Sequence, residues 1–248
     1  MASDSIDTVF TPAGESVRER LIVALDVSTA REAAELVQRI GDAAGYYKVG
    51  LQLFTAEGPN FVRELIRSGR KVFLDLKLHD IPNTVAHATT QARELGASLL
   101  TVHSSGGTAM LRAAAEAAGD RLRLLAVTIL TSMNDEDVQE IGMSGRVLDQ
   151  ALRLAALARA AGIRGVVSSP KEAAQLRKSL GEGFAIVTPG VRPRGSAVND
   201  QQRVATPGEA VAAGASHVVV GRPITNASDP AVAAAAILEE IEKAQAAR

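Results

Sequence analysis

Short apolar runs of strand length recur along the chain, and each is followed by a stretch with the apolar spacing of a helix. A short apolar run that ends at a polar residue is typical of a parallel strand covered on both faces. Such runs occupy residues 20–26, 46–50, 72–78, 98–103, 122–129, 165–168, 184–187 and 217–221. These eight β/α repeats of roughly thirty residues predict a closed, single-domain (β/α)₈ TIM barrel, whose typical size is about 250 residues.

We assign residues 20–248 to the barrel and residues 1–19, which are polar and patternless, to an N-terminal arm. A helix is expected after each strand, including one at residues 59–68 and one that begins at Pro82. The alternative fold is an open doubly wound sheet, which usually has fewer strands and a Gly-rich turn after its first strand. The first turn here reads Asp26-Val-Ser-Thr, so the glycines of that fold are missing.

The charge balance excludes several classes of partner. The chain has 27 basic and 28 acidic residues, so we expect no surface for nucleic acid and no polybasic contact with a membrane.

The chain has no cysteine, which excludes disulfides and thiolate metal sites. Asp4, Asp7 and Glu15 interrupt the N-terminus where a signal peptide would need an apolar region. We therefore expect a cytoplasmic protein.

The third strand carries two opposite charges inside an apolar run. Residues 72–85 read Val-Phe-Leu-Asp-Leu-Lys-Leu-His-Asp-Ile-Pro-Asn-Thr-Val. Alternation along a strand places Asp75 and Lys77 on the same face as Phe73, while the leucines take the other face. Because buried charges are costly unless they are paired or used, this stretch predicts a functional site.

Polar residues at the ends of neighbouring strands extend this site. The active site of a (β/α)₈ barrel lies at the C-terminal ends of its strands, where strands one and two carry Asp26 and Lys48. These two residues should cluster with Asp75 and Lys77 at one side of the barrel mouth, with Asp80 in the loop above. An alternating array of this kind satisfies its own charge and can be aimed at a transition state.

The loops after strands seven and eight are typical of phosphate binding. Residues 188–193 read Thr-Pro-Gly-Val-Arg-Pro, and residues 221–225 read Gly-Arg-Pro-Ile-Thr. Barrels frequently bind phosphate between these loops through backbone N–H groups, and arginine adds a bidentate charged contact. We expect a phosphorylated substrate whose reacting end lies over the two lysines. The loop from residue 188 to about 203 is a candidate lid.

Six motifs in order, each at a strand end, resemble the bacterial type of the orotidine 5′-phosphate decarboxylase family. They are Tyr-Lys-Val-Gly at 47–50, Leu-Asp-Leu-Lys-Leu-His-Asp-Ile-Pro-Asn-Thr at 74–84, Thr-Val-His-Ser-Ser-Gly-Gly at 101–107, Leu-Thr-Ser at 130–132, and the two phosphate-loop sequences. The resemblance runs from about Leu21 to the last helix. It implies conversion of orotidine 5′-monophosphate to uridine 5′-monophosphate and CO₂ in pyrimidine synthesis, with neither metal nor organic cofactor.

The resemblance also implies roles for individual residues. Lys77 would donate the proton to C6 of the pyrimidine, Asp75 and Asp80 would lie beside the leaving carboxylate, and Lys48 would link them to the ribose. The implied substrate contacts are Asp26 and Thr84 near the ribose, Thr131 and Ser132 at the base, and Pro189, Arg192, Gln201, Gly221 and Arg222 at the phosphate and lid. Gln201 is chosen over Gln202 because it follows Asp200, as in the family's Asp-Gln pattern. The family also implies a homodimer in which Asp80, Ile81 and Thr84 reach into the partner's site.

Two other functions remain open. A phosphosugar lyase similar to 3-keto-hexulose-phosphate synthase would keep the Asp-x-Lys-x-x-Asp strand, but it needs a carboxylate for Mg²⁺ near position 48, where this chain has Lys48. A non-catalytic barrel that binds a phosphorylated ligand would have no use for the proton donor Lys77. His79 and His103 are interpreted as packing residues.

Overall fold

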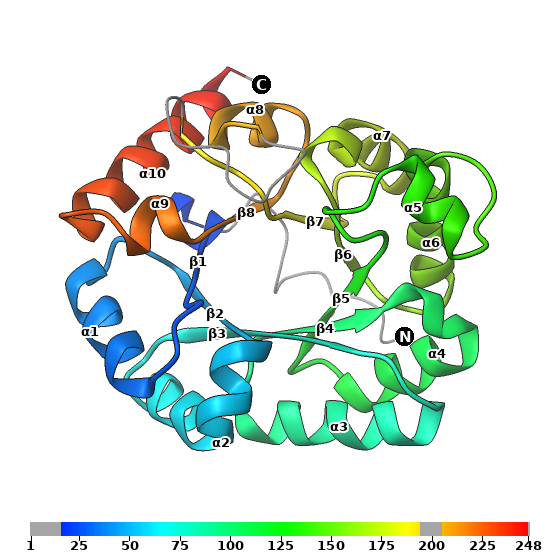
Figure 1. The fold of residues 1–248 in the computed structure, drawn as a ribbon, viewed down its shortest axis with the longest axis horizontal. Coiled ribbons are helices and arrows are strands. Elements are labelled where there is room, and N and C mark those ends of the chain that lie inside the picture. The colour runs from blue at the N-terminus through cyan, green and yellow to red at the C-terminus, as the bar shows by residue number, and fades with distance from the viewer. Residues whose placement is uncertain (1–15, 194–204, 248) are drawn as a thin grey trace, which may run out of the picture.

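The computed structural model describes residues 16–193 and 205–247, and its eight strands form a closed parallel barrel in the order of the sequence (Figure 1). The strands are β1 (Leu21–Ala24), β2 (Tyr46–Gly50), β3 (Lys71–Leu78), β4 (Leu99–His103), β5 (Arg123–Val127), β6 (Gly165–Val167), β7 (Ala185–Thr188) and β8 (His217–Val220). Pairing of β8 with β1 closes the sheet on itself. The predicted (β/α)₈ barrel is confirmed.

Helices form a ring outside the strands (Figure 1). They are α1 (Ala30–Ile40), α2 (Leu51–Arg67), α3 (Pro82–Leu95), α4 (Gly107–Ala118), α5 (Asp135–Glu140), α6 (Val147–Ala160), α7 (Pro170–Leu180), α8 (Pro207–Ala212), α9 (Arg222–Thr225) and α10 (Pro230–Ala246), with 3₁₀ turns at Val17–Arg20 and Ser104–Gly106. The sequence does not predict α9 or the turn at Ser104–Gly106, because both are too short to show an apolar period. In the two described ranges, no helix has the length and apolar character needed to cross a membrane.

The prediction for the second helix is wrong at its start. Helix α2 begins at Leu51, directly after β2, and not at residue 59. Gly58 interrupts it with a φ of 64° and a ψ of −161°, which glycine adopts far more easily than other residues, and Pro59 then opens the second half. The Gly-Pro pair therefore marks a restart inside one helix.

The N-terminal arm is only partly within the described residues. Val17–Arg20 form a 3₁₀ turn that contacts β1, β8 and α10. Residues 1–15 lie outside the described ranges, so the arm and its boundary at residue 20 stay predictions.

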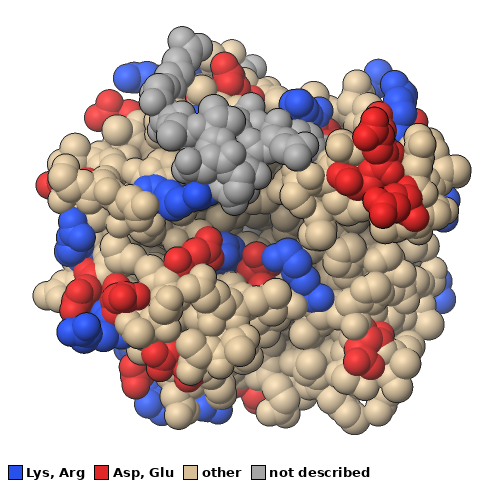
Figure 2. Space-filling view, viewed as in Figure 1, with Lys and Arg blue, Asp and Glu red and all other residues tan. Residues whose placement is uncertain are grey.

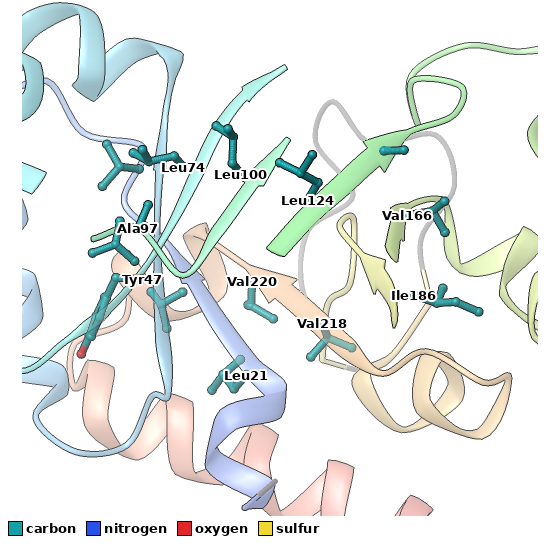
Figure 3. Close-up of a cluster of buried hydrophobic side chains, with 14 of the residues drawn as sticks. Leu21, Tyr47, Leu74, Ala97, Leu100, Leu124, Val166, Ile186, Val218 and Val220 are labelled. Atoms are coloured by element: carbon teal, nitrogen blue, oxygen red, sulfur yellow. The ribbon is translucent and has the colours of Figure 1, made fainter. Parts of the chain in front are cut away.

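Alternate strand residues build two apolar layers. One buried cluster consists of strand residues and fills the barrel; it includes Ile22, Tyr46 and Phe73. A larger cluster lies between the strands and the helices, and Figure 3 shows its strand residues, among them Leu74 and Leu100. Because both faces of the sheet are covered, each strand reads as a nearly continuous apolar run. The opposite facing of Phe73 and Leu74 agrees with the predicted alternation.

A buried arginine fixes the segments that lead into β7 and β8. Arg177 of α7 is 8% exposed, and its guanidinium donates to the carbonyl oxygens of Gly181, Phe184 and Gly214 and to the hydroxyl of Ser216. These distances lie between 2.6 and 2.9 Å. Buried carbonyl groups need partners, so one side chain satisfies acceptors from both segments.

We expect R177M to lower the free energy of unfolding by about 3 kcal/mol, because the buried acceptors lose their donors while the apolar stem is kept. Urea unfolding followed by circular dichroism measures this change. The matched control is K178M, on the exposed side of the same helix, which should change stability by less than about 0.5 kcal/mol. Coincident unfolding curves for the two variants would contradict the assigned role of Arg177.

Candidate active site

A row of alternating charges crosses the barrel mouth at the ends of β1, β2 and β3. Lys48 Nζ donates to Asp26 Oδ1 at 2.8 Å and lies 3.8 Å from Asp75 Oδ2. Lys77 Nζ contacts both carboxylate oxygens of Asp75 at 2.9 Å. Figure 2 shows acidic and basic side chains alternating in the middle of this face. The four residues that the sequence places together therefore form one charge row, in the order Asp26, Lys48, Asp75, Lys77.

Burial changes along the charge row. The side chain of Lys48 is 10% exposed and that of Asp75 is 16% exposed, whereas Lys77 is 32% and Asp26 is 60% exposed. The two central charges have lost most of their water, and each has opposite charges on both sides to compensate. Lys77, at one end of the row, keeps access to solvent.

One glycine leaves room that the charge row occupies, and a second borders the row. A Cβ atom at Gly50 would lie 2.9 Å from Lys48 Nζ and 3.4 Å from Asp26 Oδ1. A Cβ atom at Gly221, directly after β8, would lie 3.8 Å from Asp26 Oδ2. The loop after β8 and the charge row thus meet at Asp26.

The backbone at Lys77 departs from regular strand geometry. Its φ of 49° is the one positive φ of a non-glycine residue in residues 16–193 and 205–247. The pairing of β3 with β4 shifts there, since Leu74 pairs with Leu100 but Leu78 pairs with Val102. Asp75 and Lys77 do meet, as the sequence predicts, but through this irregularity and not through simple alternation.

Thr101 on β4 joins the charge row, and sequence reasoning did not single it out. Its hydroxyl oxygen accepts a hydrogen bond from the backbone N–H of Lys77 at 2.8 Å, and its O–H group donates to Asp75 Oδ1 at 3.0 Å. The available signal was a polar residue inside the apolar run at 98–103.

Asp80, Ile81 and Thr84 lie exposed around the start of α3, and Ile81 is 67% exposed. Asp80 Oδ1 accepts the backbone N–H of Ile81 at 2.7 Å. Within the described part of the chain, no hydrogen bond or ion pair joins Asp80 to either lysine of the charge row. One chain by itself therefore leaves Asp80 outside the row.

The residues predicted to bind phosphate follow β7 and β8. Pro189 comes directly after β7, and Gly221 directly after β8, where Arg222 opens α9. Arg222 is exposed, whereas Arg192 is 6% exposed.

The loop after β7 is closed at its base. The N–H of Arg192 donates to the carbonyl oxygen of Ala205 at 2.9 Å, and Val191 forms an isolated bridge with Ala205. Gln201, Gln202 and much of the candidate lid lie outside the described residues, so those assignments stay predictions.

Thr131 and Ser132, predicted to contact the base, lie in the turn after β5. Only β4 separates β5 from β3, so this turn borders the same mouth as Asp75 and Lys77. Ser132 is exposed and Thr131 is half-buried.

His79 and His103 stack at the ends of β3 and β4. Their ring centroids are 5.3 Å apart with an interplanar angle of 19°. The hydroxyl oxygen of Ser105 lies 2.7 Å from His103 Nδ1. Burial, and then electrostatic interaction with His79 and Lys77, lower the pKa of His103 below its ordinary value of 6.5. His103 is therefore biased toward its neutral form.

Residues 19–237 match the family model described as Orotidine 5'-phosphate decarboxylase / HUMPS family. The chain belongs to this family. A curated orotidine 5′-phosphate decarboxylase from Halorhodospira halophila is 53% identical over 228 residues, which cover 91% of this chain and 97% of the relative. One from Geobacter metallireducens is 49% identical over 233 residues, which cover 92% and 98%.

Comparison with solved structures points to the same family. The crystal structure of orotidine 5′-phosphate decarboxylase from Lactobacillus acidophilus has a TM-score of 0.81 and 39% identity, and the match covers 90% of this chain and 99% of that chain. The one from Pyrococcus horikoshii has a TM-score of 0.73 and 28% identity, with 90% and 99% covered. The match to proteins of this name thus extends over most of the chain.

The lowered pKa of His103 predicts a pH dependence of stability. The unfolded chain binds a proton at this group more tightly than the folded chain does, so stability should decrease as the pH falls below 6.5 and level off below the folded pKa. We expect H103N to weaken this dependence, whereas H87N, at an exposed position on α3, should not. Urea unfolding between about pH 7.5 and 5 tests this, and identical pH dependence in the wild type and H103N would contradict it.

Proposed function

We propose that this chain decarboxylates orotidine 5′-monophosphate to uridine 5′-monophosphate and CO₂ in pyrimidine nucleotide synthesis. The observation that carries the proposal is the charge row at the barrel mouth, which holds a lysine ammonium against a largely buried carboxylate. The similarity to curated decarboxylases, 53% identical in one case, supports the choice of substrate.

The chemistry requires a fixed positive charge. Loss of CO₂ leaves the electron pair of the broken C–C bond on C6 of the pyrimidine, where no carbonyl group is positioned to delocalise it. A cation already held in place can stabilise this localised charge without reorganisation. We assign that role to Lys77, which then gives a proton to C6 and becomes a neutral amine. Its side chain is 32% exposed, so solvent can return the proton.

The neighbours of Lys77 would orient it and the substrate. Asp75 engages Lys77 through both oxygens and would lie beside the leaving carboxylate, together with Asp80. Lys48, held between Asp26 and Asp75, would link this end to the ribose, whose hydroxyl groups Asp26 would bind. Because Lys77 supplies both the charge and the proton, the proposed step needs neither a metal nor an organic cofactor.

The remaining assignments follow the mouth of the barrel. Thr131 and Ser132 would contact the base and Thr84 the ribose region, while Pro189, Arg192, Gln201, Gly221 and Arg222 would hold the phosphate and lid. The phosphate takes no part in the bond changes, but its binding energy can orient the ring over Lys77. Since a phosphorylated nucleotide does not cross a lipid bilayer unaided, the enzyme must share the compartment of its substrate, which we propose is the cytoplasm.

We also propose a homodimer with shared active sites. Ile81 is a large apolar residue that is 67% exposed, and within the described ranges the neighbouring Asp80 carboxylate has a hydrogen bond to the Ile81 N–H alone. In a symmetric dimer, each subunit covers the same patch of the other. With Asp80, Ile81 and Thr84 in that patch, each copy would bring these residues to the other's charge row.

The direct test follows the ultraviolet absorbance of orotidine 5′-monophosphate with the purified protein and EDTA. We expect turnover with EDTA present, and K77A should reduce kcat by about 10⁴-fold while still binding uridine 5′-monophosphate. Absence of turnover by the wild type would refute the proposed decarboxylase activity. Sensitivity to EDTA would favour a metal-dependent lyase, and substantial activity in K77A would mean that the proton donor is another residue.

Mixing two inactive variants tests the shared site. K77A and D80A should each be nearly inactive alone. If Asp80 acts across the interface, each mixed dimer holds one site with both native residues, so equal mixing should restore about 25% of wild-type activity. If Asp80 acts within its own chain, no site in the mixture is complete and activity stays at the level of the separate variants.

A further inference from the structure

The irregular pairing of β3 with β4 leaves one residue opposite three. Leu74 pairs with Leu100 and Leu78 with Val102, so Asp75, Leu76 and Lys77 lie across from Thr101 alone. Such a bulge interrupts the hydrogen-bond ladder and leaves backbone groups in need of other partners. Lys77 is also the residue with the positive φ of 49°, which a lysine adopts only when its surroundings enforce it.

The side chain of Thr101 satisfies this bulge. Its hydroxyl oxygen accepts the N–H of Lys77 at 2.8 Å, and its proton is directed at Asp75 Oδ1, 3.0 Å away. A hydroxyl group has one proton to donate and lone pairs that accept, so both capacities are used here. Thr101 is 0% exposed, and its backbone lies in a regular register with Leu125 of β5. The hydroxyl is therefore held by a rigid strand.

We infer that Thr101 is a positioning residue that sets the geometry between Asp75 and Lys77. One contact fixes the backbone from which Lys77 extends, and the other fixes the carboxylate that Lys77 Nζ contacts through both oxygens. The inference rests on the proposed function, because it assumes that this pair carries the chemistry. Thr101 touches the pair from the β4 side and acts through it, not on the substrate.

A purely structural role would have a different signature. A buried threonine that only fills space would affect stability, and a serine would serve little better than an alanine. A positioning role depends on the hydroxyl and on the reacting end of the site. Misplacement by about 1 Å can lower turnover by about 100-fold while contacts to ribose and phosphate persist.

The experiment compares T101V, T101A and T101S with the wild type. We expect T101V and T101A to lower kcat by about 10- to 100-fold. KM and the Kd for uridine 5′-monophosphate should stay within about threefold of the wild type, and T101S should recover kcat to within about threefold. The matched control is T89V, since Thr89 on α3 is also 0% exposed and its hydroxyl has no hydrogen-bond partner in the described residues; T89V should keep wild-type kcat.

Two results would overturn the inference: a T101V variant with more than about half of the wild-type kcat, or equal losses in T101A and T101S. If T101V fails to fold, as judged by loss of nucleotide binding, the T101A and T101S pair decides alone, because these variants differ only in the hydroxyl. A wild type without turnover would instead refute the proposed function, and the positioning role with it. An active wild type with an equally active T101V refutes the positioning role alone.

Discussion

The contact between Lys48 and its two carboxylates is the interaction on which the site depends. Lys48 is 10% exposed and lies 2.8 Å from Asp26 and 3.8 Å from Asp75. Without it, Asp75, whose side chain is 16% exposed, would keep one cation and lose the charge that separates it from the carboxylate of Asp26. The parallel pairing of β1 with β2 and of β2 with β3 brings the ends of these strands side by side. The charge row thus depends on the strand order of the barrel.

Residues that stabilise the barrel and residues of the candidate site lie at opposite ends of its axis. Arg177 satisfies carbonyl groups at the entry to β7 and β8, at the N-terminal ends of the strands. The charge row, the loops after β7 and β8, and Thr101 lie toward the opposite, C-terminal ends. In barrels of this kind, residues at the first end serve folding, while residues at the second vary with function. A variant at the N-terminal ends of the strands is therefore tested by its free energy of unfolding, and a variant at the C-terminal ends by its activity.

Much of this arrangement could be predicted from the sequence. Strands covered on both faces read as apolar runs, so the eight-strand barrel is visible, and Asp26, Lys48, Asp75 and Lys77 stand out as charges at the strand ends. What could not be predicted depends on pairing between distant segments. The bulge at Lys77 exists only in the register of β3 with β4, and the role of Thr101 depends on that bulge. The start of α2 was hidden because Gly58 and Pro59 resemble a helix start. The proposed reach of Asp80 into a partner's site is not encoded in local spacing at all.

Gly50 carries no chemistry, yet its missing side chain is a condition for the charge row. A Cβ atom at this position would come within 2.9 Å of Lys48 Nζ, the far end of a side chain that can swing away. The backbone would tolerate an alanine there, while the ammonium would leave its place between the two carboxylates. Transfer of this site to another barrel therefore requires a glycine at this position as well as the four charges. A screen that measures folding alone would not detect a displaced ammonium.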